Sequence, residues 1–152
     1  MEASVTVAMD APPEQIWELV ADVRNTGKFS PEVMEAQWLD GATKPALGAT
    51  FRGHVKRNEI GPVYWTTCRV TACEPGREFG FEVLVGDRAV NNWHYRFTPT
   101  QGGTDVTESF RMNEGLFTTL FGLFGGQLRT RRNVRDMRKT LERIKAVVEA
   151  DS

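Results

Sequence analysis

The sequence predicts an α+β fold in which a curved, seven-stranded antiparallel sheet wraps around one long C-terminal helix, with short helices between strands one and two. Three observations predict this fold. Residues 2–9 alternate apolar and polar side chains, which is the pattern of a strand. The same two-residue period recurs from residue 33 to residue 113, interrupted by turn residues at hairpin spacing. Residues 127–150 then repeat apolar side chains at helical spacing.

The first strand, residues 2–9, leads directly into a helix. Asp10 and the pair Pro12 and Pro13 supply an N-cap and a rigid first turn. The apolar residues that follow lie at helical spacing: Ile16, Trp17, Leu19, Val20 and Val23. Three helix-breaking residues then end the helix: Asn25, Gly27 and Pro31. A connector or a short second helical turn therefore precedes the next strand.

Six further strands are expected, and they share alternating apolar side chains bounded by turn residues. Their ranges are 34–40, 48–57, 62–73, 78–85, 91–98 and 104–112. The connections contain short turn sequences such as Gly61-Pro62, Pro75-Gly76 and Gly102-Gly103. Because such short turns join neighbouring antiparallel strands, we expect a sequentially connected sheet.

The last part of the chain is a connector and a helix. Residues 115–126 are rich in Phe and Gly, and residues 127–150 carry one apolar stripe that includes Leu141, Ile144 and Val148. An antiparallel sheet with one apolar face needs a cover, and this helix supplies it. One helix is too narrow to fill a wide concave face, so the geometry predicts a cavity between helix and sheet.

Length and charge narrow the class of protein. The chain has 152 residues, which suits one domain over residues 1–152. Lys and Arg number 19 against 20 Asp and Glu, so the charge pattern of a general nucleic-acid binder is absent and no nucleic-acid partner is expected. Two cysteines make no disulfide framework, and neither a signal peptide nor an apolar run of about 18 residues is present. We therefore expect a cytoplasmic protein, either a monomer or a homodimer.

Strand parity assigns the large apolar side chains and a few polar ones to the inward face. The expected cavity-lining residues of the strands are Phe51, Tyr64, Thr66, Cys68, Phe79, Phe81, Asn91, Trp93, Tyr95, Glu108, Phe110 and Met112. The N-terminal half of the long helix adds Thr130, Asn133, Val134 and Met137. An apolar lining with few polar groups is typical of a small-molecule site, so a hydrophobic ligand is expected.

Glu108 and Tyr64 are the candidates for chemistry. A carboxyl group on the inward face of a central strand has a raised pKa, which suits a general acid or base or an anchor for a ligand hydroxyl. The alternatives for Glu108 are a hydrogen bond to Trp93 or to a backbone N–H, or an exit through the open end of the cavity. The alternative for Tyr64 is a core aromatic whose hydroxyl reaches water.

The sequence predicts no metal and no cofactor. His54 and His94 fall on outward parities of separate strands, and Cys68 and Cys73 have opposite parities, which is poor geometry for a tetrahedral site. No phosphate-binding glycine motif follows a strand, and no serine lies in a nucleophile-elbow motif.

The Phe-rich connector has two compatible interpretations. Phe117, Phe121 and Phe124 would close the cavity mouth as a lid, with neighbouring glycines as hinges. Alternatively, residues 116–124 would contact an anionic membrane surface transiently, beside the basic residues of 128–139, and admit a lipid. We prefer the lid.

Motifs spread over nearly the whole chain support this fold. They are Pro13-x-x-x-Trp17, Phe29-Ser30-Pro31, Gly48-Ala49-x-Phe51-x-Gly53, Trp65-x-x-Cys68-x-Val70, Glu74-Pro75-Gly76-x-x-Phe79-x-Phe81, Trp93-x-Tyr95, Gly103-Thr104-x-Val106-Thr107-Glu108 and Met137-x-x-Thr140-Leu141-x-x-Ile144-Lys145. With these motifs the sequence resembles the START-like and Bet v 1-like (SRPBCC) superfamily, in particular its bacterial polyketide cyclase/dehydrase and lipid-transport-like branch. The resemblance implies a helix-grip fold with a deep hydrophobic cavity, and activities that range from cyclisation to lipid carriage.

Three functions follow as hypotheses. The first, which we favour because the inward polar groups are few, is non-catalytic binding or transport of a lipid, an isoprenoid or a polyketide-like molecule. The second is a polyketide aromatase/cyclase or dehydratase in which Glu108 and Tyr64 transfer protons. The third is a regulatory module that binds a protein partner through the basic helix face or the Phe-rich loop.

Overall fold

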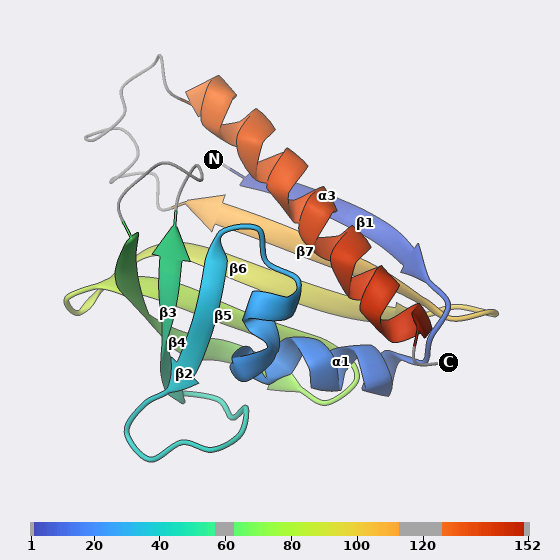
Figure 1. The fold of residues 1–152 in the computed structure, drawn as a ribbon, viewed down its shortest axis with the longest axis horizontal. Helices are drawn as coiled ribbons and strands as arrows, with labels where there is room; N and C mark the ends of the chain where they lie inside the picture. Colours follow the sequence, from blue (N-terminus) through green and yellow to red (C-terminus); the bar gives the residue numbers. More distant parts are fainter. Residues whose placement is uncertain (1, 57–62, 113–125, 151–152) are drawn as a thin grey trace.

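One antiparallel sheet of seven strands forms the body of the protein in a computed structural model that describes residues 2–56, 63–112 and 126–150 (Figure 1). The strands are β1 (Glu2–Met9), β2 (Val33–Trp38), β3 (Thr50–Lys56), β4 (Val63–Glu74), β5 (Glu78–Val85), β6 (Arg88–Pro99) and β7 (Thr104–Met112). The helices are α1 (Pro13–Ala21), the 3-10 helix η1 (Val23–Lys28) and α3 (Gly126–Ala150). The predicted α+β helix-grip fold is confirmed.

The strand order is β1-β7-β6-β5-β4-β3-β2, so β2 to β7 are neighbours in sequence order, as the short turns predict. β1 departs from this rule because it pairs with β7, the last strand. The α1–η1 segment carries the chain from β1 across one end of the sheet to β2 at the opposite edge (Figure 1). The two edge strands are therefore joined by helices that lie over the sheet.

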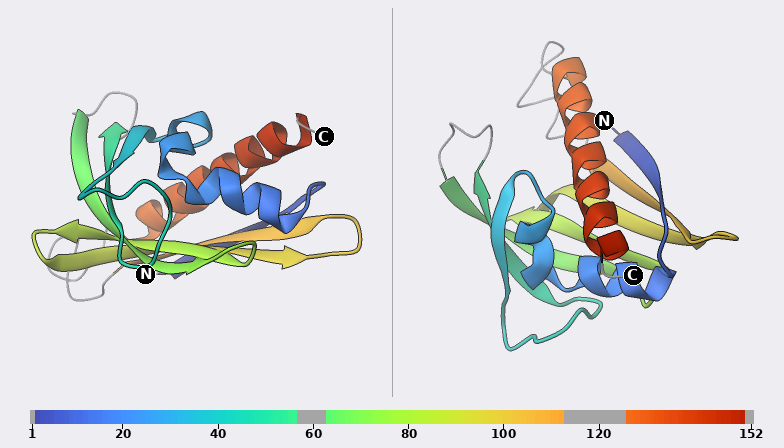
Figure 2. Two further views of the ribbon diagram at one scale, coloured as in Figure 1. Left: turned by 90° about the horizontal axis from the view of Figure 1, so that it is seen from below. Right: turned by 45° about the vertical axis from the view of Figure 1, so that its right-hand side comes forward.

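The helices of the described residues all lie on the same side of the sheet, and α3 runs along β1 and β7 (Figures 1 and 2). The apolar stripe of α3 is buried there, with Leu141 and Ile144 at 0% exposure. α1 adds Ile16 and Trp17 to the same core, and the Trp17 indole N–H donates to the Glu78 carbonyl at 2.8 Å. Because α3 covers the β1 edge, much of the sheet face from β6 to β3 lies beside the helix rather than under it.

The start of α1 differs from the prediction. The residue before the helix is Pro12 in an extended conformation, Pro13 occupies the first turn, and no side chain caps the helix. Asp10 precedes the helix by three residues and does not cap it, and its own backbone N–H donates to the Glu149 carboxylate of α3 at 2.9 Å. Asp10 thus ties the segment between β1 and α1 to α3 through its backbone, and its side chain is not an N-cap.

A bulge in β4 corrects the parity expected for the two cysteines. The register with β5 shifts between Val70 and Ala72, so Cys73 pairs with Phe79 while Cys68 pairs with Val83. An extra residue in a strand reverses the alternation beyond it. Cys73 therefore packs against the same core as Cys68 despite the odd spacing between them.

Gly27 allows η1 to lie directly against β2. A Cβ atom at this position would meet the Met34 carbonyl oxygen at 2.3 Å, which no real side chain tolerates. The η1–β2 segment consequently forms a wall that faces α3 across the concave side of the sheet (Figure 2). Among the described residues, no helix has the length and apolar character needed to cross a membrane.

Candidate ligand-binding pocket

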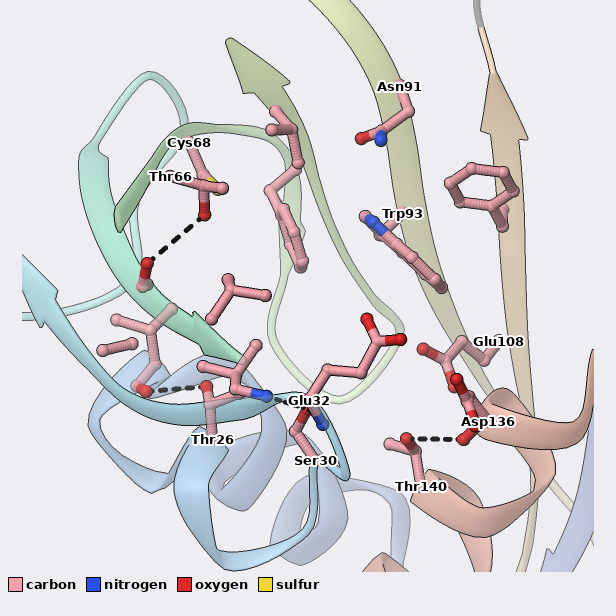
Figure 3. Close-up of a pocket in the computed structure, with 18 of the residues that line it drawn as sticks. Thr26, Ser30, Glu32, Thr66, Cys68, Asn91, Trp93, Glu108, Asp136 and Thr140 are labelled. Carbon is pink, nitrogen blue, oxygen red and sulfur yellow. Dashed lines mark hydrogen bonds between the residues drawn. The ribbon is translucent and has the colours of Figure 1, made fainter. Parts of the chain in front are cut away.

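A pocket of about 600 Å³ lies between the concave face of the sheet, the η1–β2 wall and residues 133–140 of α3 (Figure 3). Its volume falls in the range of small-molecule sites. Most of its lining is apolar, with Phe, Val and Trp side chains of β3, β5, β6 and β7. The pocket occupies the part of the sheet face that α3 leaves uncovered.

The structure places every strand residue of the expected set on the pocket wall: Phe51, Tyr64, Thr66, Cys68, Phe79, Phe81, Asn91, Trp93, Tyr95, Glu108, Phe110 and Met112. Asn133 and Met137 of α3 also line it. Their role in ligand binding stays a prediction, because the lining shows position and not occupancy.

Val134 is a correction to the expected lining. It packs, partly buried, against the main core and is not part of the pocket wall. One residue step turns a helix by about 100°, so Val134 faces away from the direction of Asn133 and Asp136. The Thr130 side chain and the proposed lid residues Phe117, Phe121 and Phe124 lie outside the residues whose side chains the structure describes.

The η1–β2 wall is the part of the pocket that the sequence did not indicate. It contributes Thr26, Phe29, Ser30, Pro31, Glu32 and Val33. Ser30 Oγ accepts a hydrogen bond from the Val33 N–H at 3.0 Å, and Thr26 Oγ1 donates to the Val23 carbonyl at 2.7 Å. The sequence motif that could have indicated this wall is Phe29-Ser30-Pro31, but on its own it indicates only a connector. Its position opposite the sheet depends on how the chain packs in three dimensions.

A second bulge, in β6, adds a charged residue to the lining. Val83 pairs with Asn91 and Leu84 with Ala89, so Val90 is an extra residue in β6. Both Arg88 and Val90 therefore line the pocket beside Asn91, although strict alternation would put them on the outer face.

Glu108 is buried at 3% exposure and its carboxyl group is held by a phenol. The Tyr95 hydroxyl donates to Glu108 Oε2 at 2.8 Å, whereas Oε1 is buried without a hydrogen-bond partner among the described residues. Burial raises the pKa of Glu108 to about 8, although the hydrogen bond from Tyr95 lowers it in part. Burial, together with the adjacent Glu108 charge, also raises the pKa of Tyr95 well above its ordinary value.

This arrangement differs from each alternative considered for Glu108, because its partner is neither Trp93 nor a backbone N–H and its side chain does not reach solvent. Tyr64 is not the phenol beside it. Tyr64 lies on β4, three strands away from β7 in the sheet, and is 38% exposed. At a strand spacing of about 4.8 Å, Tyr64 is not in hydrogen-bonding range of Glu108 across the sheet.

Asn91 carries the second orphaned oxygen of the pocket. Its Oδ1 is buried with no hydrogen-bond partner in the described part of the chain. Trp93 follows on the same face of β6, and its ring lies 4.6 Å from that of Phe110 on β7. Asn91, Trp93 and Glu108 thus form a row along these two strands (Figure 3).

Thr66 and Cys68, which β4 contributes to the pocket wall, are less suited to acid–base or nucleophilic chemistry than Glu108. Thr66 Oγ1 donates to the Gly53 carbonyl at 3.4 Å, and burial raises the pKa of the Cys68 thiol to about 12. Such a thiol stays protonated at neutral pH and is a poor nucleophile.

Carboxyl groups outnumber basic groups in the described lining. The carboxyl groups are those of Glu32, Glu108 and Asp136, and the basic group is the guanidinium of Arg88. The Glu32 carboxylate reaches into the pocket from the η1–β2 wall (Figure 3). Within residues 2–56, 63–112 and 126–150, no group of three His, Cys, Asp or Glu side chains is arranged to hold a metal ion. His54 and His94 lie elsewhere, His54 stacked on Trp65 at 4.3 Å and His94 paired with Glu78 at 3.0 Å.

A sheet that grips one helix beside a deep, mostly apolar pocket defines a protein of the SRPBCC type. The family model described as polyketide cyclase / dehydrase and lipid transport matches residues 1–149, so the chain belongs to this family. No curated protein matches the sequence.

Solved structures share the fold of this chain. The Polyketide_cyc-like protein Cgl2372 from Corynebacterium glutamicum is 28% identical with a TM-score of 0.68, over 99% of this chain and 92% of that one. Protein Ms6760 from Mycobacterium smegmatis is 22% identical with a TM-score of 0.70, over 99% and 92%. The di-domain ARO/CYC protein BexL from the BE-7585A biosynthetic pathway is 19% identical with a TM-score of 0.71, over 98% of this chain and 50% of that one.

Proposed function

We propose that the protein binds a hydrophobic small molecule, such as a lipid, an isoprenoid or a polyketide-like compound, in the pocket between the sheet and α3. The observation that carries this proposal is the pocket itself, with a volume of about 600 Å³ and a lining of aromatic and aliphatic side chains. Binding an apolar molecule on such a surface lowers the free energy, because apolar surface of both the protein and the ligand is removed from water. The lipid-transport part of the family description supports the same function.

Two measurements test the proposal. Native mass spectrometry of the gently purified protein, followed by organic extraction, should reveal a co-purifying apolar molecule. Titration with a neutral dye that fluoresces in apolar surroundings, such as Nile red, should show saturable binding to one site.

Gly53→Leu is the variant that should block the pocket. Gly53 is buried on the pocket wall, and a Cβ added there has its nearest neighbours at 3.6 Å, so the substitution is accepted and the rest of the side chain enters the cavity. We expect the dye affinity to fall about tenfold or more, because crowding a packed site costs about 1–3 kcal/mol. The matched control is Gly102→Leu, where an added Cβ meets nothing within 4 Å. Equal dye binding by both variants would contradict the proposal.

A second candidate function, a polyketide aromatase/cyclase or dehydratase, is favoured by the Glu108–Tyr95 pair. A buried carboxyl group with a pKa of about 8 can hold or release a proton near neutral pH, as a general acid or base must. The family description and the likeness to BexL support this candidate. In this form of the hypothesis Tyr95, rather than Tyr64, is the phenol that acts with Glu108.

The two candidates are distinguished by Glu108→Gln, which keeps the shape of the side chain and removes its acid–base chemistry. A carrier retains its ligand affinity and shows no turnover in either form. An enzyme retains binding and loses turnover of a poly-β-ketone substrate by about a hundredfold or more.

The remaining hypotheses stay proposals of lower rank. Contact with a membrane surface or with a protein partner would involve residues 116–124 or the basic side chains of 128–139. Liposome flotation with anionic vesicles tests the first, and a cross-linking comparison of the wild type with Phe117→Ser and Phe121→Ser tests the second.

A further inference from the structure

Two buried oxygen atoms on the pocket wall have no hydrogen-bond partner among the described residues, Glu108 Oε1 and Asn91 Oδ1. Buried polar atoms in folded proteins almost always have a partner, since leaving one unpaired costs about 1–3 kcal/mol. A third such atom, the Trp38 indole nitrogen, is not part of the pocket lining. The two oxygens that face the cavity are thus positions where a bound molecule can supply the missing hydrogen bond.

The register of the sheet fixes how far apart these two points are. Glu108 lies opposite Tyr95, and Met112 lies opposite Asn91, so the two points are separated by four residues along β6. At about 3.3 Å per residue, their backbone positions are about 13 Å apart. Trp93 and Phe110, which lie opposite each other in the register of β6 and β7, stand between them, with their rings tilted by 53° and the centroids 4.6 Å apart. Figure 3 shows Trp93 between Asn91 and Glu108.

The two hydrogen-bonding points carry no formal charge at neutral pH. Burial raises the pKa of Glu108 to about 8, so its carboxyl group is mostly protonated there, and the Asn91 amide is neutral. A carboxylate, phosphate or ammonium group would give up its hydration in this mostly apolar space without meeting an opposite charge at either point, which disfavours a charged ligand.

We propose that Glu108 and Asn91 form a two-point hydrogen-bonding site that selects an elongated, uncharged apolar ligand with an oxygen-bearing group near each end. The ligand body packs against Trp93 and Phe110, one hydroxyl or carbonyl group bonds to the Glu108 carboxyl, and the other bonds to the Asn91 amide. This inference rests on the proposed function of the pocket and specifies the class of molecule it takes.

The test uses a series of anthracene derivatives with the full-length protein. The members are the anthracenediol with hydroxyl groups at its two far ends, the anthracenol with one of them, the matching anthracenecarboxylic acid and the cationic aminomethylanthracene. Their intrinsic fluorescence reports binding, and displacement of Nile red confirms that they share one pocket. We expect the diol to bind about three- to tenfold more tightly than the alcohol, and both to bind more tightly than the acid and the amine.

Asn91→Leu removes one of the two points and should abolish the preference for the diol over the alcohol. The matched control is Asn92→Leu on the next residue of β6, whose side chain is exposed on the outer face and which should keep the preference. For the other point, the double variant Glu108→Leu with Tyr95→Phe removes both hydrogen-bonding partners and leaves no orphaned hydroxyl. It should also make the diol and the alcohol bind equally.

The outcomes separate this inference from the proposed function. Tighter binding of the acid or the amine than of the diol would overturn the inference, as would a preference for the diol that survives in Asn91→Leu. In those cases Nile red binding still supports the pocket as a ligand site. If neither Nile red nor any anthracene derivative binds the wild type, the proposed function fails and the inference fails with it.

Discussion

The two ends of the concave sheet face have the same strand pattern but opposite contents. At the filled end, α1 packs on β5 and β6, α3 packs on β1 and β7, and Ile16, Leu141 and Ile144 are completely buried. At the pocket end, the same face of β3 to β7 meets the η1–β2 wall and residues 133–140 of α3 across a cavity of about 600 Å³. Alternation puts apolar side chains inward at both ends, so the position of the helices alone determines which end is core and which is pocket.

Buried polar groups show the same contrast. At the filled end, the Thr104 hydroxyl donates to the Ala11 carbonyl at 2.8 Å. At the pocket end, Glu108 has one partnered oxygen and one orphaned oxygen, and Asn91 has an orphaned oxygen. A packed core completes its hydrogen bonds internally, whereas a binding site leaves some to be completed by a ligand.

The largest effect should come from making a cavity at the filled end. Leu141→Ala should lower the free energy of unfolding by about 2–5 kcal/mol, because Leu141 has no exposed surface and its neighbours relax only in part. A matched pair on the sheet is Val106→Ala, at the filled end, and Val83→Ala, on the pocket wall. Val83→Ala should cost under about 1 kcal/mol, since one side of Val83 already lacks packed neighbours. Urea denaturation measures all three, and equal losses for the two valines would remove the contrast between the ends.

The next effect is a dependence of stability on pH that originates at the pocket end. The pKa of Glu108 is about 8 in the folded protein and 4.5 in its ordinary state, so the folded state binds this proton more tightly. The stability due to the neutral carboxyl group is fully present below about pH 4.5 and is lost as the pH rises to about 8, by on the order of a few kcal/mol. Subtracting the curve of Glu108→Gln isolates this contribution. A difference that stays constant between pH 4.5 and 8 would show that the folded pKa is not raised.

A smaller effect is expected when the phenol beside Glu108 is removed. Tyr95→Phe should cost about 1–3 kcal/mol, because it leaves both carboxyl oxygens of Glu108 without a partner. It should also raise the pKa of Glu108 further, since the hydrogen bond from Tyr95 lowers it. Carbon NMR of the Glu108 carboxyl group during a pH titration measures this shift. Tyr64→Phe is the control, and an equal pKa change in that variant would assign the effect to something other than the hydrogen bond.

The smallest effects should have opposite signs at the two ends. Thr104→Val should cost about 1 kcal/mol, because it removes the donor to the buried Ala11 carbonyl. Asn91→Leu should leave the stability of the ligand-free protein unchanged or slightly raised, since it replaces an unpaired polar group with an apolar one. Thermal denaturation of the ligand-free protein compares them. A loss of stability in Asn91→Leu as large as in Thr104→Val would indicate that Asn91 is already fully partnered.

Much of the pocket was predictable because a strand reports its faces locally. Glu108 and Phe110 line the same wall because residues two apart in a regular strand face the same way. The prediction failed where the strand is irregular. The β6 bulge brings Arg88 to the wall, and the β4 bulge puts Cys73 on the core side. Bulges depend on how two strands fit together, and no local periodicity marks them.

The second feature that the sequence did not predict is which residues face each other across the sheet and across the pocket. The sequence placed Tyr95 and Glu108 on inward faces, but only the register of β6 with β7 sets them directly opposite each other. The η1–β2 wall was likewise not predictable from local sequence. Its Glu32 reaches the pocket (Figure 3), although it is far along the chain from the strands β5 to β7 on the other side of the pocket.

The sequence by itself determined the number and type of elements, the inward face of nearly every strand and the identity of the buried carboxyl group. It could do so because side-chain periodicity and turn chemistry act over a few residues. The tertiary structure decided that α3 lies along β1, that β1 closes onto β7, and that the remaining concave face is a pocket with two unpaired oxygens. These depend on contacts between residues more than a hundred positions apart, such as Glu2 and Arg111, where packing and register rather than local preference set the geometry.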